Sequence, residues 1–209
     1  MDVAGSCQRR DSIWILGGGT LADLPVAELA AMFRQVVIFD IALLWSARQA
    51  VKRWSNVSLR LADVTGLVRP LARWKSGMSL PVPGNGLAGL ETPPDCVLSL
   101  NLMSQLPLLP MQHLQRAGLP RSAAEDFGRG MLRAHFDSLG ALDCPVGVTA
   151  DLRRIWRSRA GEPVMSESAL LDMDLPAVEQ EWTWPLAPLG EIDPETGLDV
   201  RVGALRLNC

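Results

Sequence analysis

The sequence has few residues suited to disulfide, redox or zinc chemistry. Four cysteines are dispersed among 209 residues, and no two of them form a CxxC pair. Zinc and thiol-redox motifs are therefore unsupported, no metal site is expected, and a reducing cytoplasm fits this usage. Cys96 and Cys144 fall in or beside expected strands, where we expect small buried side chains. The other two are Cys7 and Cys209.

Long apolar runs are missing too. No stretch of about 18 apolar residues is present, so we expect no membrane-spanning helix. The first residues, MDVAGSCQRRDS, are polar and lack the apolar core of a signal peptide, which argues against secretion. We therefore expect a cytoplasmic protein in which residues 1–11 form a loose polar leader.

The chain also lacks a strong net charge and has little histidine or tyrosine. A net charge of −3 gives no large electrostatic footprint for DNA or RNA, so no nucleic-acid partner is expected. There is no tyrosine, and His113 and His135 are the two histidines. His135 fits a general base if its helix faces a cleft, and otherwise a packed or surface residue.

The clearest pattern lies between residues 12 and 40. Residues 13–16 are apolar and favour a strand, Gly17-Gly18-Gly19 follow at once, and a second apolar run at 36–39 ends at Asp40. Glycines permit positive φ angles and let a backbone approach a ligand closely. Asp40 stands where ligands bind in open α/β sheets, and its carboxylate can accept hydrogen bonds from both hydroxyls of a ribose. The pattern indicates half of a nucleotide-binding βαβ unit. The alternative is a structural glycine turn followed by a strand-capping aspartate.

Two helix starts carry capping signals. Asp23 is placed as an N-cap, with Pro25 in the first turn of a helix that leads to the second strand. Ser122 and Glu125 match a capping box at the start of a later helix. The apolar side of the first helix is expected to comprise Leu24, Ala27, Ala31 and, less regularly, Leu29 and Met32.

Strands and helices alternate along the rest of the chain. This order predicts an α/β fold with a mostly parallel sheet, closed by an antiparallel C-terminal hairpin. One domain over residues 12–209 is the economical arrangement for this length. The apolar segment 106–119 suits a lid, a core or a subunit contact, so it leaves the oligomeric state open. The expected elements are helices at 41–54, 67–74 and 122–139, a helical piece within 106–119, strands at 57–62, 96–100, 145–150, 181–186 and 198–204, and a long loop at 78–94 that could order over a ligand.

Polar side chains follow two of these strands. Asp63 ends the strand in LADVTG and suits either an adenine amino group or a local Asx turn. Asn101, Ser104 and Gln105 follow strand 96–100. They suit either hydrogen bonds that orient a substrate or closure of the turn after the strand.

The C-terminal third carries arginines and tryptophans. Arg153, Arg154, Arg157 and Arg159 are expected on a solvated helix face or paired with local acids, with an anion site as the alternative.

Trp182 and Trp184 share one face of a strand, either as cover for the core or as a platform for a ligand. The alternation slips at Leu205 and Leu207, which predicts a bulge or burial on the opposite face.

The glycine turn, Asp40, Asp63 and Asn101, in this order of elements, resemble the class I S-adenosylmethionine-dependent methyltransferases over residues 12–207. More narrowly, GGGTLADLPVAELAAMF, VVIFDI, ADVTG and DCVLSLNLMSQLPLLP resemble a bacterial methyltransferase-like group. The resemblance implies a Rossmann-like three-layer sandwich with a seven-stranded sheet, one strand of it antiparallel. It also implies that S-adenosylmethionine lies across the strand ends.

The resemblance also implies roles for single residues. Gly17, Gly18 and Gly19 would approach the methionine part of the cofactor, and Asp40 would hold the ribose. Asp63 and Val64 would flank the adenine, and Asn101 would lie near the transferred methyl group. For catalysis the candidates are Asn101, Ser104 and His135, and we expect a small molecule as the methyl acceptor.

The chain departs from the family pattern at three places. Ile15 stands where the first motif usually has an acid, and Leu21 stands at its third glycine. After the fourth strand the chain has Asn101-Leu102-Met103-Ser104 in place of an Asp or Asn, two prolines and an aromatic residue. The last departure speaks against methylation of nucleobase amino groups.

Two other functions fit parts of the pattern. The departures motivate a non-catalytic methyltransferase-like fold that binds a nucleoside ligand or a protein partner. Gly17-x-Gly19-x-x-Ala22 with Asp40 also fits a nicotinamide-dependent oxidoreductase. ADVT at 62–65 is likewise seen in short-chain dehydrogenases, but these need a Tyr-x-x-x-Lys pair that a chain without tyrosine cannot supply.

Overall fold

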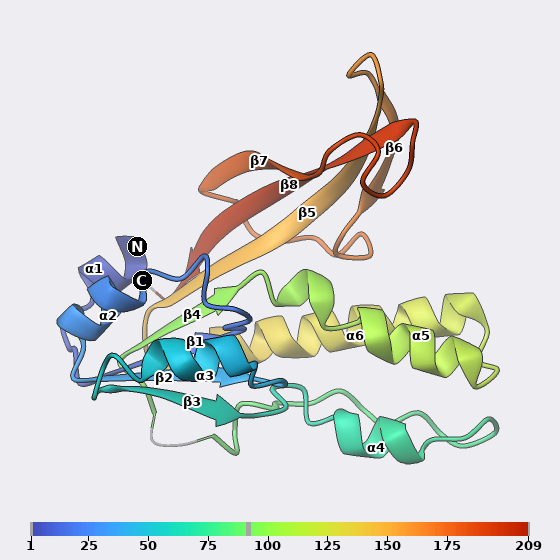
Figure 1. Ribbon diagram of the computed structural model, residues 1–209. Coiled ribbons are helices and arrows are strands. Elements are labelled where there is room, and N and C mark those ends of the chain that lie inside the picture. Colours follow the sequence, from blue (N-terminus) through green and yellow to red (C-terminus); the bar gives the residue numbers. More distant parts are fainter. Residues whose placement is uncertain (1, 91–92, 209) are drawn as a thin grey trace.

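The structure, a computed structural model, describes residues 2–90 and 93–208, so Cys209 and two residues of the loop 78–94 lie outside the described residues. One sheet runs through it in the order β3-β2-β1-β4-β5-β8-β7, and β6 pairs with β5 beside this path (Figure 1). The strands are β1 Ser12–Leu16, β2 Gln35–Asp40, β3 Val57–Leu61, β4 Cys96–Leu100, β5 Val146–Ser158, β6 Pro163–Ser168, β7 Gln180–Ala187 and β8 Thr196–Leu207. The helices are α1 Asp2–Ser6, α2 Val26–Met32, α3 Trp45–Val51, α4 Val68–Arg73, α5 Leu108–Arg116 and α6 Arg121–Gly140, with a 3-10 turn η1 Met103–Gln105.

Strand directions confirm the expected α/β architecture. The pairs among β1, β2, β3, β4 and β5 are all parallel, and β8 is antiparallel to both β5 and β7. Along the seven-strand path β8 is therefore the one reversed strand of the described chain. The hairpin of β7 and β8 closes the sheet as expected, whereas β6, which is antiparallel to β5, was not expected.

Alternating side chains of the central strands bury both faces of the sheet. Ile13 and Ile15 of β1 face a cluster with buried side chains of α1, α2 and α3. Trp14 and Leu16 face the other way, into a cluster that includes Leu132 of α6. Because successive side chains of a strand point to opposite faces, this five-residue strand needs helices on both sides. The result is the expected three-layer sandwich.

The last strands extend well beyond these layers. Figure 1 shows β5, β6, β7 and β8 rising above the helices as a twisted ribbon, which we call the β-arm. The expected strand at 145–150 is wrong in length, because β5 continues to Ser158. Arg153, Arg154 and Arg157 therefore lie on a strand and not on a helix. Two of them do pair with acids, Arg154 with Glu167 and Arg157 with Asp199.

Helix starts differ from the capping signals. Helix α2 begins after Pro25, and Asp23 makes no cap. Its buried residues are Val26 and Leu29, whereas the expected apolar positions Ala27 and Ala31 are exposed.

The later helices show the same discrepancy. Helix α3 begins at Trp45 and not at residue 41, because the chain bends over 41–44. Helix α6 begins after Pro120 without a side-chain cap, so the capping box is also wrong. Glu125 accepts a hydrogen bond from Arg121 instead, at 2.8 Å. Proline, with its φ fixed near −65°, sets these two starts in place of a capping side chain.

Both chain ends pack more closely than expected. The leader contains helix α1, whose Val3 and Ala4 are buried against the sheet. At the other end, Leu205 is buried in the α6-side cluster, so the alternation slips because the end of β8 is covered on its opposite face. The register shift that accompanies the slip lies on β5, between Asp151 and Arg153.

Cys96 and Cys144 are both buried, as the sequence predicts, and Cys7 is buried as well. Burial raises the pKa of the Cys144 thiol to about 11, so the nucleophilic thiolate form is scarce at neutral pH.

Replacement of Gly18 by alanine should destabilise the fold. A Cβ at Gly18 would lie 2.5 Å from Cγ2 of Ile38, inside the sheet core. Overpacking of this kind costs about 1–3 kcal/mol in the free energy of unfolding, measurable from urea denaturation. Gly89→Ala is the control, because a Cβ there meets no atom within 4 Å. Equal denaturation midpoints for the two variants would contradict the packing.

His135 should make stability depend on pH. Its imidazole is 2% exposed, and burial lowers its pKa to about 4 from an ordinary 6.5. Between these values the unfolded chain binds a proton that the native protein does not, so stability falls as pH falls. The full loss is about 3 kcal/mol.

Urea denaturation across this pH range would measure the effect. His135→Gln, which retains a polar group opposite Ser99, should show a shallower loss than the wild type. If His135→Gln loses stability as steeply as the wild type, the imidazole is already charged in the folded protein.

Candidate functional site

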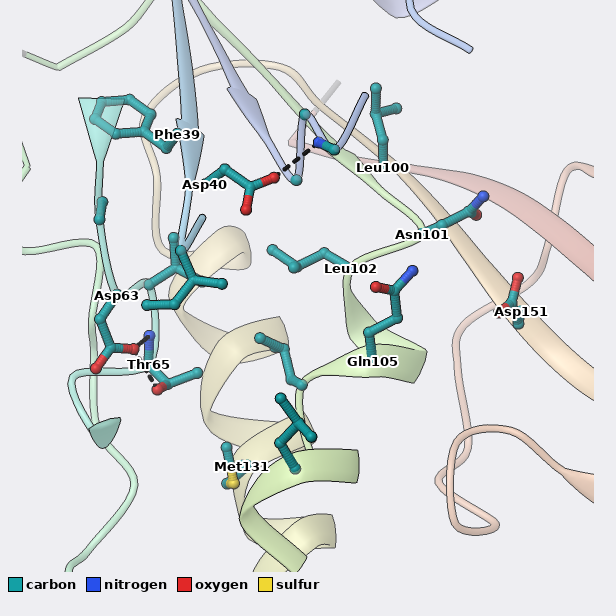
Figure 2. Close-up of a pocket in the computed structure, with 18 of the residues that line it drawn as sticks. Phe39, Asp40, Asp63, Thr65, Leu100, Asn101, Leu102, Gln105, Met131 and Asp151 are labelled. Carbon is teal, nitrogen blue, oxygen red and sulfur yellow. Dashed lines mark hydrogen bonds between the residues drawn. The ribbon is translucent and has the colours of Figure 1, made fainter. Parts of the chain in front are cut away.

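A cavity of about 660 Å³ opens at the carboxyl ends of β1, β2 and β4. The glycine turn Gly17–Gly19, Asp40, Asp63 and Asn101 line it, so the structure brings the main sequence-predicted residues together. Figure 2 shows Asp40 and Asp63 on one side of this space, and Asn101 and Gln105 across from them. The edge where parallel strands end is the usual ligand crevice of such sheets.

The glycine turn, at the carboxyl end of β1, lines one part of this cavity. Gly17 and Gly19 have φ angles of 85° and 51°, which glycine adopts without the strain of a side chain. The N–H of Gly17 donates to the carbonyl oxygen of Phe39 at 3.0 Å, which ties the turn to β2. A Cβ on Gly19 would meet nothing within 4 Å, so the backbone there is open to a ligand.

Asp40 is held in place by the turn that it faces. Its Oδ2 accepts a hydrogen bond from the Gly19 N–H at 2.8 Å, and its Oδ1 accepts one from the Ala42 N–H at 3.0 Å. A carboxylate has about four acceptor positions. About two of them therefore stay available to hydroxyl donors in the cavity.

Asp63 makes the local turn that was the alternative to a ligand contact. Its Oδ1 accepts hydrogen bonds from the Thr65 N–H at 3.0 Å and the Thr65 hydroxyl at 2.6 Å. Its Oδ2 accepts a third from the Val68 N–H at 2.8 Å, at the start of α4. About one acceptor position is then left for a ligand, while the adjacent Val64 is buried and lines the cavity.

Asn101 has an unusual backbone and an unmatched side chain. Its φ is 50°, and its N–H donates to Thr149, to the carbonyl oxygen at 2.9 Å and to the hydroxyl at 3.1 Å. Its side-chain Oδ1 is buried without a hydrogen-bond partner in the described part of the chain. A buried acceptor that lines a cavity and has no protein donor is suited to a donor on a ligand.

The other two catalytic candidates lie behind the cavity wall. Ser104 is fully buried and donates to the Asp151 carboxylate at 2.9 Å. His135 does not line the cavity, and its Nε2 lies 3.4 Å from the Ser99 hydroxyl within the core. A neutral, enclosed imidazole of this kind is poorly placed to take a proton from a substrate.

Among the residues that line the cavity, sequence reasoning gave Asp151 of β5 no role. It considered Arg154 of β5 only in an alternative anion site and Trp184 of β7 only in an alternative ligand platform, and both line the cavity. Asp151 directly follows the expected strand 145–150, so the strand-end position that drew attention to Asp40 and Asp63 applies to it equally. Trp182 and Trp184 are 42% and 38% exposed, so they are not the core cover that was expected.

The departures from the family motif have structural explanations. Ile15 is fully buried on the α2 side of β1, in the core. Leu21 has a φ of 65°, the conformation that a glycine adopts more easily, and its side chain is buried beside Gly18. Apolar burial offsets the left-handed backbone there, since the two effects are of similar size, about 1–3 kcal/mol each.

The loop 78–94 and the segment 106–119 differ in whether they line the cavity. No described residue of the loop 78–94 lines the cavity, although Gly86 passes so close to the Val64 carbonyl that a Cβ would lie 2.0 Å from it. In α5, Leu109 lines the cavity while Leu114 is buried in the α4–α6 cluster. The segment 106–119 therefore serves both as cavity wall and as core.

Neither a metal cluster nor a membrane-spanning helix is found in the described part of the chain. Within residues 2–90 and 93–208, no group of three or more His, Cys, Asp or Glu side chains is placed to hold a metal ion. No helix in this part of the chain is long and apolar enough to span a bilayer.

Comparisons with known proteins find similar structures of low sequence identity. No family model and no curated protein matches the chain. The N-methyltransferase NodS from Bradyrhizobium japonicum WM9 aligns over 97% of this chain and 90% of its own, with 14% identity and a TM-score of 0.42. An rRNA methylase from Streptococcus thermophilus aligns over 98% and 93%, with 14% identity and a TM-score of 0.39.

The strand order of the chain itself supports the fold assignment. The path β3-β2-β1-β4-β5-β8-β7 has the seven strands and the single reversed strand that the sequence resemblance implied. The glycine turn and Asp40 lie at the strand ends, as in a nucleotide-binding sheet. The chain thus has the Rossmann-like fold of the class I methyltransferases.

Proposed function

We propose that the protein binds S-adenosylmethionine in this cavity and transfers its methyl group to a small molecule. The observation that carries the proposal is the pairing of Asp40 with the open glycine turn, since it places a half-available carboxylate beside exposed backbone. The cofactor would supply a methyl group already activated on a sulfonium sulfur. The chain has to bind and orient the two reactants and to accept a proton from an acceptor that carries one.

Each part of the cofactor has a matching group. Gly17, Gly18 and Gly19 leave room for the methionine part, and Asp40 can accept the ribose hydroxyls. Val64 offers an apolar surface for the adenine, with one acceptor position of Asp63 near it. Asn101 offers its unmatched Oδ1 to a donor close to the reacting centre.

The charges around the cavity favour a cationic ligand. Four aspartates and one arginine line it, so the net field attracts the sulfonium and disfavours polyanions. Four arginines of the β-arm strands pair with acids, as in the pairs Arg201–Glu181 and Arg206–Glu179, while Arg153 donates to the Ser166 hydroxyl. These pairs leave little free positive charge for a phosphate backbone, which supports a small-molecule acceptor over RNA or DNA. We also propose that the protein acts in the cytoplasm.

Removal of the Asp40 carboxylate should weaken cofactor binding. Asp40→Ala would lose about two charge-assisted hydrogen bonds to the ribose, worth about 3 kcal/mol together. That loss corresponds to about a hundredfold in affinity. Isothermal titration with S-adenosylmethionine and S-adenosylhomocysteine would measure it, with NAD titrated in parallel.

Two further variants test whether the loss of affinity comes from the Asp40 carboxylate. Asp23→Asn is the matched control, because Asp23 lines the same cavity, is exposed and carries an equal charge, whereas the carboxylate that is hydrogen-bonded to the glycine turn is that of Asp40. Asp40→Asn keeps one acceptor oxygen and should give an intermediate loss. Unchanged affinity in both Asp40 variants would place the ligand elsewhere. Absence of binding by all ligands to the wild type would favour the non-catalytic alternative.

Loss of the Asn101 side chain should weaken cofactor binding without destabilising the fold. Asn101→Gly removes the side-chain amide and tolerates the φ of 50°. We expect weaker cofactor binding by about 1–3 kcal/mol, the cost of one lost hydrogen bond to a buried acceptor, with little change in urea midpoint. A variant that binds normally would show that Oδ1 has no ligand partner.

A further inference from the structure

The cavity does not stop at the strand ends but continues onto the β-arm. Asp151 and Arg154 of β5, Trp184 and Leu186 of β7, and Val200 of β8 line this extension. They lie apart from the glycine turn and Asp40, which the proposed cofactor would occupy. The extension therefore offers room for a second ligand beside the first.

A bulge in β5 aims two charged side chains into this extension. In a regular strand, residues three positions apart point to opposite faces. The register shift between Asp151 and Arg153 changes this, because Asp151 pairs with Val202 and Arg154 pairs with Val200. Since Val200 and Val202 share one face of β8, Asp151 and Arg154 share it too. Bulges often re-aim side chains beside functional sites in this way.

The Asp151 carboxylate is held by a hydrogen bond from the core and lines the cavity. Ser104, which is fully buried, donates to its Oδ2. None of the ion pairs within the described ranges involves Asp151. Figure 2 shows its side chain on the opening shared with Asn101 and Gln105. A positioned carboxylate without a cationic partner is suited to bind a cation.

The neighbouring charge of Arg154 is already balanced. Its guanidinium lies 3.3 Å from Glu167 of β6. Trp184, which pairs with Val200 just as Arg154 does, adds a half-exposed indole to the same wall. Leu186 and Leu109, both exposed, complete an apolar rim. An indole and a carboxylate that line the same cavity, as Trp184 and Asp151 do, attract organic cations.

From these contacts we infer that the arm end of the cavity binds the methyl acceptor, and that the acceptor is an amine on an apolar or aromatic group that binds as its ammonium form. Asp151 accepts one proton from this ammonium, and the neutral nitrogen then forms its bond to the methyl carbon as the bond from that carbon to the sulfonium sulfur breaks, which leaves S-adenosylhomocysteine. The carboxylate of Asp151 holds the ammonium, while Trp184 and the rim leucines cover the apolar part. This inference rests on the proposed function, because the acceptor belongs to the same reaction.

Saturation-transfer NMR with three matched probes tests the inference. The probes are 2-phenylethylamine, 2-phenylethanol and phenylacetate, each titrated onto the full chain with and without S-adenosylhomocysteine. We expect the amine to bind most tightly and the acid most weakly. Asp151→Asn should weaken the amine about tenfold, as the loss of one charge-assisted hydrogen bond does, and should leave the alcohol unchanged.

Trp184→Ala and Trp182→Ala form a matched pair. Both remove a comparably exposed indole from the same strand, but Trp182 does not line the cavity. Amine binding should weaken only in Trp184→Ala, and this pair keeps the test valid if Asp151→Asn fails to fold. Equal binding of the three probes, tighter binding of the acid, or equal effects of the two tryptophan variants would overturn the inference.

Titration of S-adenosylhomocysteine into the same samples separates the two proposals. If it binds while the amine does not, the acceptor inference alone is wrong. If it does not bind but the amine still depends on Asp151, the arm end is an amine site and the proposed methyl transfer is wrong.

Discussion

The hydrogen bond from the Gly19 N–H to the Asp40 carboxylate joins the ends of β1 and β2, and the candidate site is built around it. It fixes the glycine turn against the neighbouring strand, together with the bond from Gly17 to Phe39. The turn can adopt this path because two of its residues have positive φ and because Gly18 leaves no side chain against Ile38. The same carboxylate thus organises the turn and faces the cavity.

The β-arm extends this strand-end site in a second direction. A regular β5 would have sent Asp151 and Arg154 to opposite faces, and only the bulge brings them to one wall. Ser104, a residue that looks catalytic in the sequence, instead supports Asp151 from the core. The cavity therefore has an end built from glycines and strand-end acids, and an end built from the β-arm, which suits two ligands held side by side.

Much of the fold could be predicted because its signals are local. The strand at 96–100 agrees with β4 residue for residue, because a short apolar run that ends at a polar turn marks where the strand ends. Helix starts were less predictable: Asp23 and Ser122 look like caps, yet Pro25 and Pro120 precede the helices. A capping side chain is one of several ways to begin a helix, and packing decides which is used.

The sequence by itself determined the alternation of strands and helices, the glycine turn and the strand-end acids, because each depends on neighbours within a few residues. Tertiary structure decided which polar groups reach the cavity. His135 became a core residue because its side of α6 packs on the sheet. Asp151 and Trp184 became cavity wall because β5 pairs with β8, which lies tens of residues later in the chain, and β8 carries β7 along its other edge. No local pattern encodes such long-range pairing, which forms only when the whole sheet does.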